Sequence, residues 1–289
     1  MDHTDEKGCP MPYSADINRT NPTCFIFLVD QSSSMLEPFG GQVEKQKAEG
    51  VADAINRLLQ NLILKCAKAD GIRDYFYVGV IGYGGRVFSA LGGGLAGQTL
   101  VPISAIANNP LRVEQRTRKV DDGAGGIFEQ KFKFPIWVES KANGRTPMCE
   151  ALKTAKQYLQ VFLGRFASCY PPLVVNITDG MATDGDPRAD AQALRELSST
   201  DGNALLFNAH ISVTNALPIE FPSAEEHLPD NFAKLLFRMS SKLPPRLFES
   251  ARADKFPVQP EARGFVFNAD LVSVIRFLDI GTRVAQTVR

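Results

Sequence analysis

The chain has 289 residues, and its 32 Lys and Arg side chains balance its 32 Asp and Glu side chains, so the formal net charge is zero. This balance argues against a protein that coats nucleic acid, because such proteins usually carry a clear basic excess. A hydrophobic share of 44% and a charged share of 22% exclude a chain that is disordered throughout.

The first 21 residues predict a polar N-terminal arm. They contain no apolar stretch of the kind that directs secretion, and the longest apolar runs elsewhere are far shorter than the roughly 20 residues that span a bilayer. The five cysteines are odd in number and form no CxxC pair, which favours free thiols over disulfides or a zinc site. We therefore expect a cytoplasmic protein that does not enter a membrane.

Strands and helices are expected to alternate along the rest of the chain. The continuous apolar run at 24–29 (CFIFLV) predicts a central buried strand. Apolar residues at helical spacing predict a long amphipathic helix at 42–66. Further strands are predicted at 75–81, 87–91, 173–177, 204–211 and 264–268, and further helices at 147–163, 187–197, 230–239 and 271–281. This order predicts a doubly wound α/β fold, with a mostly parallel sheet flanked by helices and one short antiparallel edge strand.

We expect a single domain over residues 22–289, because no repeat and no linker is visible. Two segments exceed the minimal alternating pattern. An insertion at about 92–135 opens with GGGLAG and contains a hairpin-like stretch, and a segment at about 240–262, rich in Pro and charge, predicts a long surface loop. Long loops of this kind are usually functional or disordered.

The insertion contains a basic stretch, which includes Arg112, Arg116, Arg118 and Lys119. It is interpreted either as a solvated face or as a contact for an acidic protein surface. Nucleic-acid binding is not favoured. The aromatic residues that could stack on bases, Phe128, Phe132 and Phe134, follow only later and with the period of a packed hairpin.

The sharpest chemical signal is Asp30-Gln31-Ser32-Ser33-Ser34, directly after the first central strand. Ligands of open α/β sheets bind outside the carboxyl ends of the strands. One carboxylate and two hydroxyls on alternate residues are hard oxygen donors, which suit Mg²⁺ or Mn²⁺. Taken alone, the serines could equally cap a helix or form a turn.

Two further oxygen donors are expected at the same edge. Asp179 ends the strand at 173–177 in the sequence ITDG, and Thr146 begins a helix in the sequence NGRTP. Each has an ordinary explanation, since Asp-Gly is a common turn and a Thr before Pro is a natural helix cap. Because three loops each supply the ligand type that Mg²⁺ prefers, we interpret them together as one metal site.

As a set, these motifs resemble the metal-ion-dependent adhesion site of von Willebrand factor A domains, and the resemblance covers roughly residues 22–285. It implies hydroxyl ligands from Ser32, Ser34 and Thr146, and direct or water-mediated ligands from Asp30 and Asp179. It also implies that Gly144 and Gly180 permit tight turns. Shorter segments (FIFLVDQSSSM, GVIGYG, GRTPMCEAL and NITDG) resemble bacterial A domains linked to tellurium resistance and stress response, often encoded beside a kinase and a phosphatase.

The resemblance implies a protein-interaction module, not an enzyme, that captures an Asp or Glu of a protein partner on Mg²⁺ or Mn²⁺. Two alternatives stay open. One is a Mg²⁺-dependent phosphotransferase or phosphatase with Asp30 as nucleophile, although position 32 is Ser and no Lys lies in the 30–34 or 176–186 loops. The other is a structural domain with no ligand at this edge.

Overall fold

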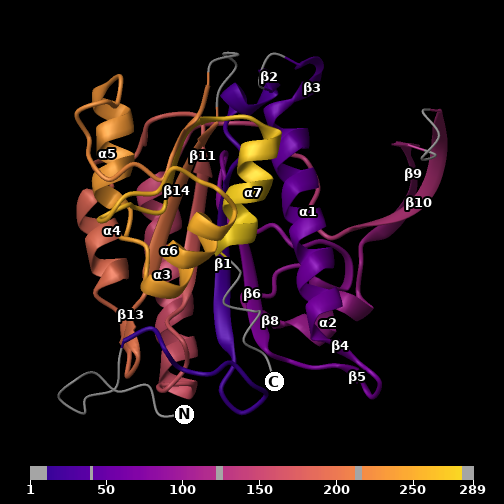
Figure 1. Cartoon of the computed structure of the whole chain (residues 1–289), viewed down its shortest axis with the longest axis horizontal. Coiled ribbons are helices and arrows are strands. Elements are labelled where there is room, and N and C mark those ends of the chain that lie inside the picture. The colour runs from indigo at the N-terminus through magenta and orange to yellow at the C-terminus, as the bar shows by residue number, and fades with distance from the viewer. Residues whose placement is uncertain (1–11, 40–41, 122–125, 212–216, 282–289) are drawn as a thin grey trace.

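A computed structural model describes residues 12–39, 42–121, 126–211 and 217–281. The remaining parts of the N-terminal arm, the insertion and the C-terminal end, with Cys9, lie outside the described residues. Five parallel strands form the centre of the sheet, and the predicted α/β fold is confirmed (Figure 1). In spatial order they are β16 (Phe265–Ala269), β14 (Leu205–Ile211), β11 (Leu173–Thr178), β1 (Thr23–Asp30) and β6 (Phe76–Tyr83).

Short antiparallel strands flank this parallel centre on both sides. β7 (Val87–Ser89) and β8 (Val101–Pro102) pair with β6, and β15 (Ile219–Glu220) pairs with β16. The predicted antiparallel edge strand is therefore confirmed as β7. Smaller elements are η1 (Ser33–Leu36), η2 (Gly93–Leu95) and the ladders β2–β3 (Pro38–Phe39, Gln42–Gln46), β4–β5 (Ala67–Lys68, Gly71–Ile72) and β12–β13 (Ser198–Ser199, Gly202–Asn203).

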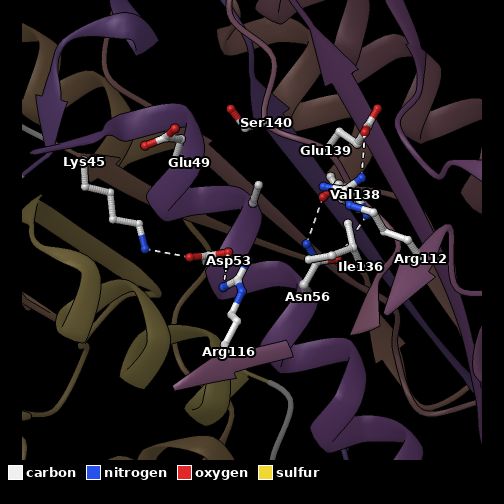
Figure 2. A pocket seen from close by; sticks show the side chains of 11 residues that line it. Lys45, Glu49, Asp53, Asn56, Arg112, Arg116, Ile136, Val138, Glu139 and Ser140 are labelled. Carbon is white, nitrogen blue, oxygen red and sulfur yellow. Dashed lines mark hydrogen bonds and ion pairs between the residues drawn. The ribbon is translucent and has the colours of Figure 1, made fainter. Parts of the chain in front are cut away.

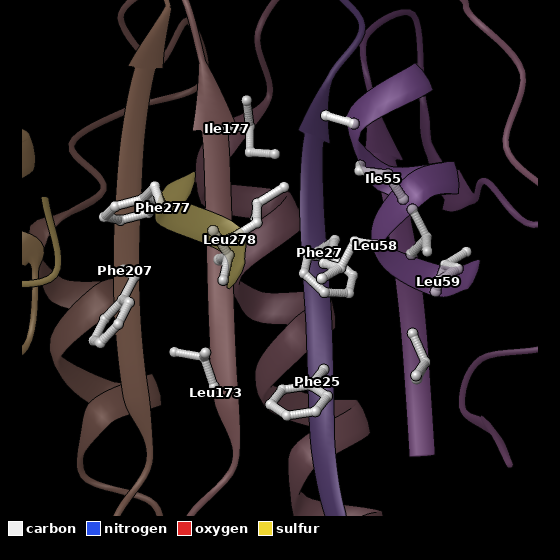
Figure 3. Close-up of a cluster of buried hydrophobic side chains, with 14 of the residues drawn as sticks. Phe25, Phe27, Ile55, Leu58, Leu59, Leu173, Ile177, Phe207, Phe277 and Leu278 are labelled. Atoms are coloured by element: carbon white, nitrogen blue, oxygen red, sulfur yellow. The ribbon is translucent and has the colours of Figure 1, made fainter. Parts of the chain in front are cut away.

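Helices cover both faces of the sheet. One face carries α1 (Lys47–Cys66), α2 (Ile103–Asn108), α6 (Pro245–Ala253) and α7 (Leu271–Gly281). The other carries α3 (Met148–Arg165), α4 (Arg188–Arg195) and α5 (Asn231–Met239). Successive side chains of β1 alternate between the two cores: Phe25 and Phe27 join the α1 side (Figure 3), and Ile26 and Leu28 join the α3 side. A strand buried on both faces explains the continuous apolar run in the sequence.

The long helix begins later than its apolar period predicts. Residues 42–46 form β3, and α1 starts at Lys47. The N–H of Gln46 donates to the carboxylate of Glu49 at 3.2 Å, which satisfies a backbone group at the helix start. Because α1 starts here, Lys47 lies at the carboxyl edge of the sheet, with its side chain buried.

The insertion predicted at 92–135 consists of two different parts. Residues 93–108 form η2, β8 and α2, and their buried Val101, Ile103 and Ile106 belong to the main core, so this part completes the edge of the fold. Only β9 (Arg112–Asp121) and β10 (Ile127–Ile136) extend from the body, as a two-stranded hairpin (Figure 1). The basic stretch is therefore one strand of this hairpin, and the aromatic stretch is the other.

The prediction of a surface loop at 240–262 is wrong in its centre. Residues 245–253 form α6, whose Leu247 and Ala251 are buried in the main core. The Pro245 at the start of this helix is compatible with the first helical turn, where no backbone N–H is needed. The described end of the N-terminal arm also packs on the body, since Ile17 is buried and the N–H groups of Ser14 and Ala15 donate to Asp201.

Candidate metal centre

Asp30 ends β1 with its side chain completely buried. Its Oδ1 accepts a hydrogen bond from the N–H of Ser32 at 2.9 Å, and its Oδ2 accepts one from the Thr178 hydroxyl at 2.8 Å. Burial raises the pKa of Asp30 to about 6, although these hydrogen bonds act in the opposite direction. The carboxylate is thus fixed in orientation but poorly solvated, and a nearby cation would stabilise its charged form.

The two serine hydroxyls connect Asp30's loop to Asp179. Ser32 Oγ and Ser34 Oγ lie 3.0 Å apart, and the Ser34 hydroxyl donates to Asp179 Oδ1 at 2.7 Å. Asp179 follows the last residue of β11, the strand next to β1, so parallel pairing brings the two strand ends together. Four of the five predicted donors, Asp30, Ser32, Ser34 and Asp179, therefore lie in one group.

Thr146 reaches this edge through its loop. The N–H of Asn143 donates to Gln31 O at 2.7 Å, and the N–H of Ser33 donates to Gly144 O at 3.1 Å. Thr146 itself is buried, and its N–H donates to the Thr183 hydroxyl at 3.0 Å. Its own hydroxyl makes no hydrogen bond to any residue that the structure describes.

The simple capping explanation for Thr146 is wrong. α3 begins at Met148, so its N-cap residue is Pro147 and not Thr146, and no N-cap side chain bonds to the N–H groups of the first turn. The N–H groups at the helix start are instead bonded by Asp184, which lies in the loop after β11. Its two carboxylate oxygens accept from the N–H groups of Cys149 and Glu150 at 3.1 and 2.9 Å. A carboxylate at this position also interacts favourably with the helix dipole. The Thr146 hydroxyl is therefore available for another role.

One charged residue at the site was not predicted. The Lys47 ammonium donates to Asp179 Oδ2 at 2.8 Å and to Glu37 Oε2 at 2.7 Å. The side chains of Lys47 and Asp179 are 4% and 0% exposed, whereas that of Glu37 is 54% exposed. The loops at 30–34 and 176–186 contain no lysine, as the sequence shows, and α1 supplies one from outside them.

The arrangement of oxygens fits a small divalent cation. Neighbouring oxygen ligands on octahedral Mg²⁺, each about 2.1 Å from the ion, lie about 3 Å apart. The Ser32–Ser34 and Ser34–Asp179 oxygens, which hydrogen-bond to each other at 3.0 and 2.7 Å, are compatible with this spacing. Asp179 meets Lys47 through its other oxygen, Oδ2. Within the described ranges no three His, Cys, Asp or Glu side chains form a metal-binding group, so hydroxyls and water would have to complete the coordination.

The two glycines of the site differ in what the backbone requires. Gly144 has φ +81°, and a Cβ there would lie 2.5 Å from both Cα and N of Gly85. Gly180 has no left-handed backbone, and no atom would lie within 4 Å of an added Cβ. The expectation that glycine is needed for a tight turn therefore holds for Gly144 and is wrong for Gly180.

Gly144→Ala is expected to lower the free energy of unfolding by about 2 to 4 kcal/mol, because it combines backbone strain with a steric clash against the backbone. Gly180→Ala is the matched control and should change it by less than about 1 kcal/mol. Urea unfolding of both variants tests this difference. Equal destabilisation by the two substitutions would contradict the assignment of strain to Gly144 alone.

His210 does not add a metal ligand to the group. Burial lowers its pKa to about 4, and its ring stacks on Phe267 with centroids 4.4 Å apart. Its Nδ1 accepts a hydrogen bond from the N–H of Asn268 at 3.1 Å. The imidazole is therefore a neutral, packed side chain at the end of β14.

Two of the four cations in the basic stretch of the insertion are paired with carboxylates of the protein. Arg112 bonds Glu114 and Glu139, and Arg116 bonds Glu114 and Asp53 of α1. Arg112, Arg116, Asp53 and Glu139 line a cleft of about 800 Å³ between the hairpin and α1 (Figure 2). Within the described residues, Arg118 and Lys119 form no ion pair with a carboxylate.

The three phenylalanines lie on one face of the hairpin, where Phe128 is paired with Val120 and Phe134 with Glu114 of the other strand. Register pairs Phe132 with Arg116, and the Arg116 guanidinium lies 4.0 Å from the ring centroid of Phe134. Phe134 is buried at the root of the hairpin, as predicted for a packed face, whereas Phe128 near the tip is 48% exposed. The packed interpretation therefore holds for the root but not for the tip.

No family model matches this sequence, and no curated protein is similar to it. Solved structures similar to it include the vWF domain of the type V pili tip protein Mfa5 from Porphyromonas gingivalis (14% identity, TM-score 0.33, covering 56% of this chain and 39% of that one). The ArnB paralog VWA2 from Sulfolobus acidocaldarius is similar at 14% identity and TM-score 0.34, over 68% of this chain and 36% of that one. The PilB minor pilin from Streptococcus sanguinis is similar at 12% identity and TM-score 0.33, over 55% of this chain and 30% of that one.

This chain thus spans less than two fifths of the length of each of these neighbours. At such low identities and TM-scores, the function must be inferred from the side chains described above. No helix in the described part of the chain is both long and apolar enough to cross a membrane.

Proposed function

We propose that the carboxyl edge of the sheet is a metal-dependent site that captures an acidic side chain of a protein partner. The observation that carries this proposal is the group of oxygen donors from two neighbouring strand ends, with Ser34 Oγ 3.0 Å from Ser32 Oγ and 2.7 Å from Asp179 Oδ1. Mg²⁺ or Mn²⁺ would be held by Asp30, Ser32, Ser34, Thr146 and Asp179, directly or through water. The motif resemblance to von Willebrand factor A domains supports the same assignment.

The donor set explains why a carboxylate would be the preferred ligand. Two carboxylates and three neutral hydroxyls are five donors, so an octahedral divalent cation held by all of them would keep one position open for a further carboxylate oxygen. The chain's own residues fix the donors in advance. Both oxygens of Asp30 are held, and the backbone bonds of Gln31 and Ser33 join its loop to residues 143 and 144.

The β9–β10 hairpin would supply a second, selective contact. Residues 112–136 contain six basic and four acidic side chains in a chain whose net charge is zero. Its distal part presents Phe128, Ile127 and the cations Arg118 and Lys119 to solvent. Phe128 and Arg118 lie on one face of the hairpin, and an acidic surface with some apolar area complements that face. The local resemblance to stress-response A domains supports a bacterial signalling assembly, with a kinase or phosphatase as one candidate partner.

Lys47 strengthens the enzymatic alternative in one respect. Phosphoryl transfer on an aspartate needs a cation beside the phosphate, and Lys47 is bonded to Asp179. The position two residues after Asp30 is still occupied by Ser32, where that chemistry commonly uses a second carboxylate. We therefore propose a binding module rather than an enzyme, acting as one domain over residues 22–289 in the cytoplasm.

Partner capture with and without chelator tests the proposed function. The immobilised full chain is expected to retain specific proteins from a lysate in Mg²⁺, to release them in EDTA, and to recover them when Mn²⁺ is added. Capture that persists in EDTA would show that a metal is not the contact. Turnover of a phosphate ester that disappears in Asp30→Ala would instead establish the enzymatic alternative.

A further inference from the structure

Lys47 brings an ammonium group to an edge where a divalent cation is proposed to bind. Its ammonium joins Asp179, whose side chain is fully buried, to Glu37, whose side chain is more than half exposed. Both bonds are short, at 2.8 and 2.7 Å, and the lysine side chain is only 4% exposed. A buried lysine is stable only with such partners, so its placement is specific.

We infer that Lys47 is a built-in competitor of the divalent cation for Asp179, and that it sets the metal concentration at which the site loads. This inference rests on the proposed function. Asp179 divides its two oxygens between the Ser34 hydroxyl and the ammonium, so the carboxylate is neutralised by the chain itself. A divalent ion held through the Ser34 side of Asp179 would lie within a few ångströms of the ammonium, and like charges at this range in a buried site repel strongly.

Glu37 gives the ammonium an alternative partner. It precedes β2 and lies between η1 and the start of α1, and its backbone O accepts the N–H of Lys47 at 2.9 Å. When Asp179 turns toward a metal, the ammonium can remain bonded to Glu37 rather than lose both partners. Glu37 therefore lowers the cost of loading, whereas Lys47 raises it.

The same lysine stabilises the protein before a metal binds. Without it, the buried carboxylate of Asp179 would lack a counter-charge, which is strongly unfavourable. We therefore expect Mg²⁺ to stabilise the native chain only modestly. Removal of the ammonium should make this stabilisation larger, because tighter binding to the native state raises its stability further by mass action.

The test is Mn²⁺ binding by the full chain, which is measured from the electron paramagnetic resonance signal of the free ion. Lys47→Met is expected to bind Mn²⁺ about tenfold to a hundredfold more tightly than the native chain. Lys45→Met is the matched control, since Lys45 pairs with Asp53 outside the site, and its affinity should be unchanged. Glu37→Gln should bind Mn²⁺ about threefold more weakly than the native chain, because the Lys47 ammonium then depends more on Asp179.

A second readout protects the test against a variant that folds poorly. Lys47→Gln removes the charge but keeps a polar side chain, one bond shorter than lysine, and it should also bind Mn²⁺ more tightly than the native chain. Its melting temperature should be lowered in EDTA and restored by Mg²⁺, whereas that of Lys45→Met should not respond in this way. Unchanged or weaker Mn²⁺ binding by both Lys47 variants would overturn the inference alone. Failure of the native chain and of both variants to bind Mn²⁺ would overturn the proposed function as well.

Discussion

Replacing Asp30 with alanine is expected to weaken Mg²⁺ binding by more than about a hundredfold and to abolish metal-dependent partner capture. Asp30 would provide one of only two carboxylates to the metal, and it also holds the Ser32 backbone and the Thr178 hydroxyl in place. Isothermal titration calorimetry with Mg²⁺ measures the first effect, and capture by the immobilised chain measures the second.

Asp186→Ala is a suitable control for this loss. Asp186 lies in the loop after β11, but it is exposed and bonds Arg188 rather than the site. Its removal should leave Mg²⁺ affinity unchanged. If Asp30→Ala bound Mg²⁺ as tightly as the native chain, Asp30 could not be a ligand.

The same carboxylate should make the metal-free protein less stable than it could be. The pKa of Asp30 is raised from an ordinary value of 3.8 to about 6 by burial, so between about pH 4 and pH 6 the folded chain holds more protons than the unfolded chain. The stability of the native chain in EDTA therefore falls as the pH rises through this window. Asp30→Asn lacks this loss and should be more stable near pH 7 by on the order of 2 to 3 kcal/mol.

Urea unfolding of Asp30→Asn and the native chain, in EDTA and at several pH values, measures this difference. It should be close to zero near pH 4 and complete somewhat above pH 6. A difference that stays constant across this range would show that the Asp30 charge is not its cause. A site that lowers stability in order to hold a ligand is a common compromise in functional proteins.

Replacing Asn56 with alanine is expected to lower the free energy of unfolding by about 3 to 5 kcal/mol. Asn56 is a buried residue of α1 whose Oδ1 accepts the N–H groups of Trp137 and Val138, at 2.9 and 3.0 Å. Its Nδ2 donates to Val138 O at 2.8 Å (Figure 2). Alanine would leave three buried backbone groups without partners, and each such group is costly.

Asn61→Ala provides the matched control for this substitution. It removes the same side chain from an exposed position of the same helix and should change stability by less than about 0.5 kcal/mol. Circular dichroism during urea unfolding measures both. Similar losses of stability at the two positions would show that helix propensity is the cause, and not the lost hydrogen bonds between Asn56 and the root of the hairpin.

The sequence could predict most of the site because its positions follow from the parallel sheet. Asp30 and Asp179 each follow an apolar run buried on both faces, and the ends of neighbouring parallel strands must meet. Ser32 and Ser34 then follow Asp30 by chain proximity. Thr146 was expected at the same edge, and its loop is indeed bonded there, although its hydroxyl meets none of the other four donors.

Lys47 and the first strand of the hairpin could not be predicted in the same way. Residues 44–50 contain only one hydrophobic side chain, Ala48, so the apolar pattern does not mark where α1 begins, and only the tertiary contact with Asp179 gives the lysine its role. β9 has mostly exposed side chains on both faces, so it lacks the alternation of apolar and polar residues that identifies strands. Its partner β10 was recognisable because Phe132, Phe134 and Ile136 alternate.

The hairpin root described above also contains the chain's single tryptophan. Trp137 is 2% exposed, and its indole N–H donates to Ile106 O at 2.6 Å, between β10 and α2. All tryptophan fluorescence of this protein therefore arises from one buried indole at the junction of the hairpin and the body. Its emission would report on that junction alone, and it offers a spectroscopic view of whether a partner bound along the hairpin disturbs the domain beneath it.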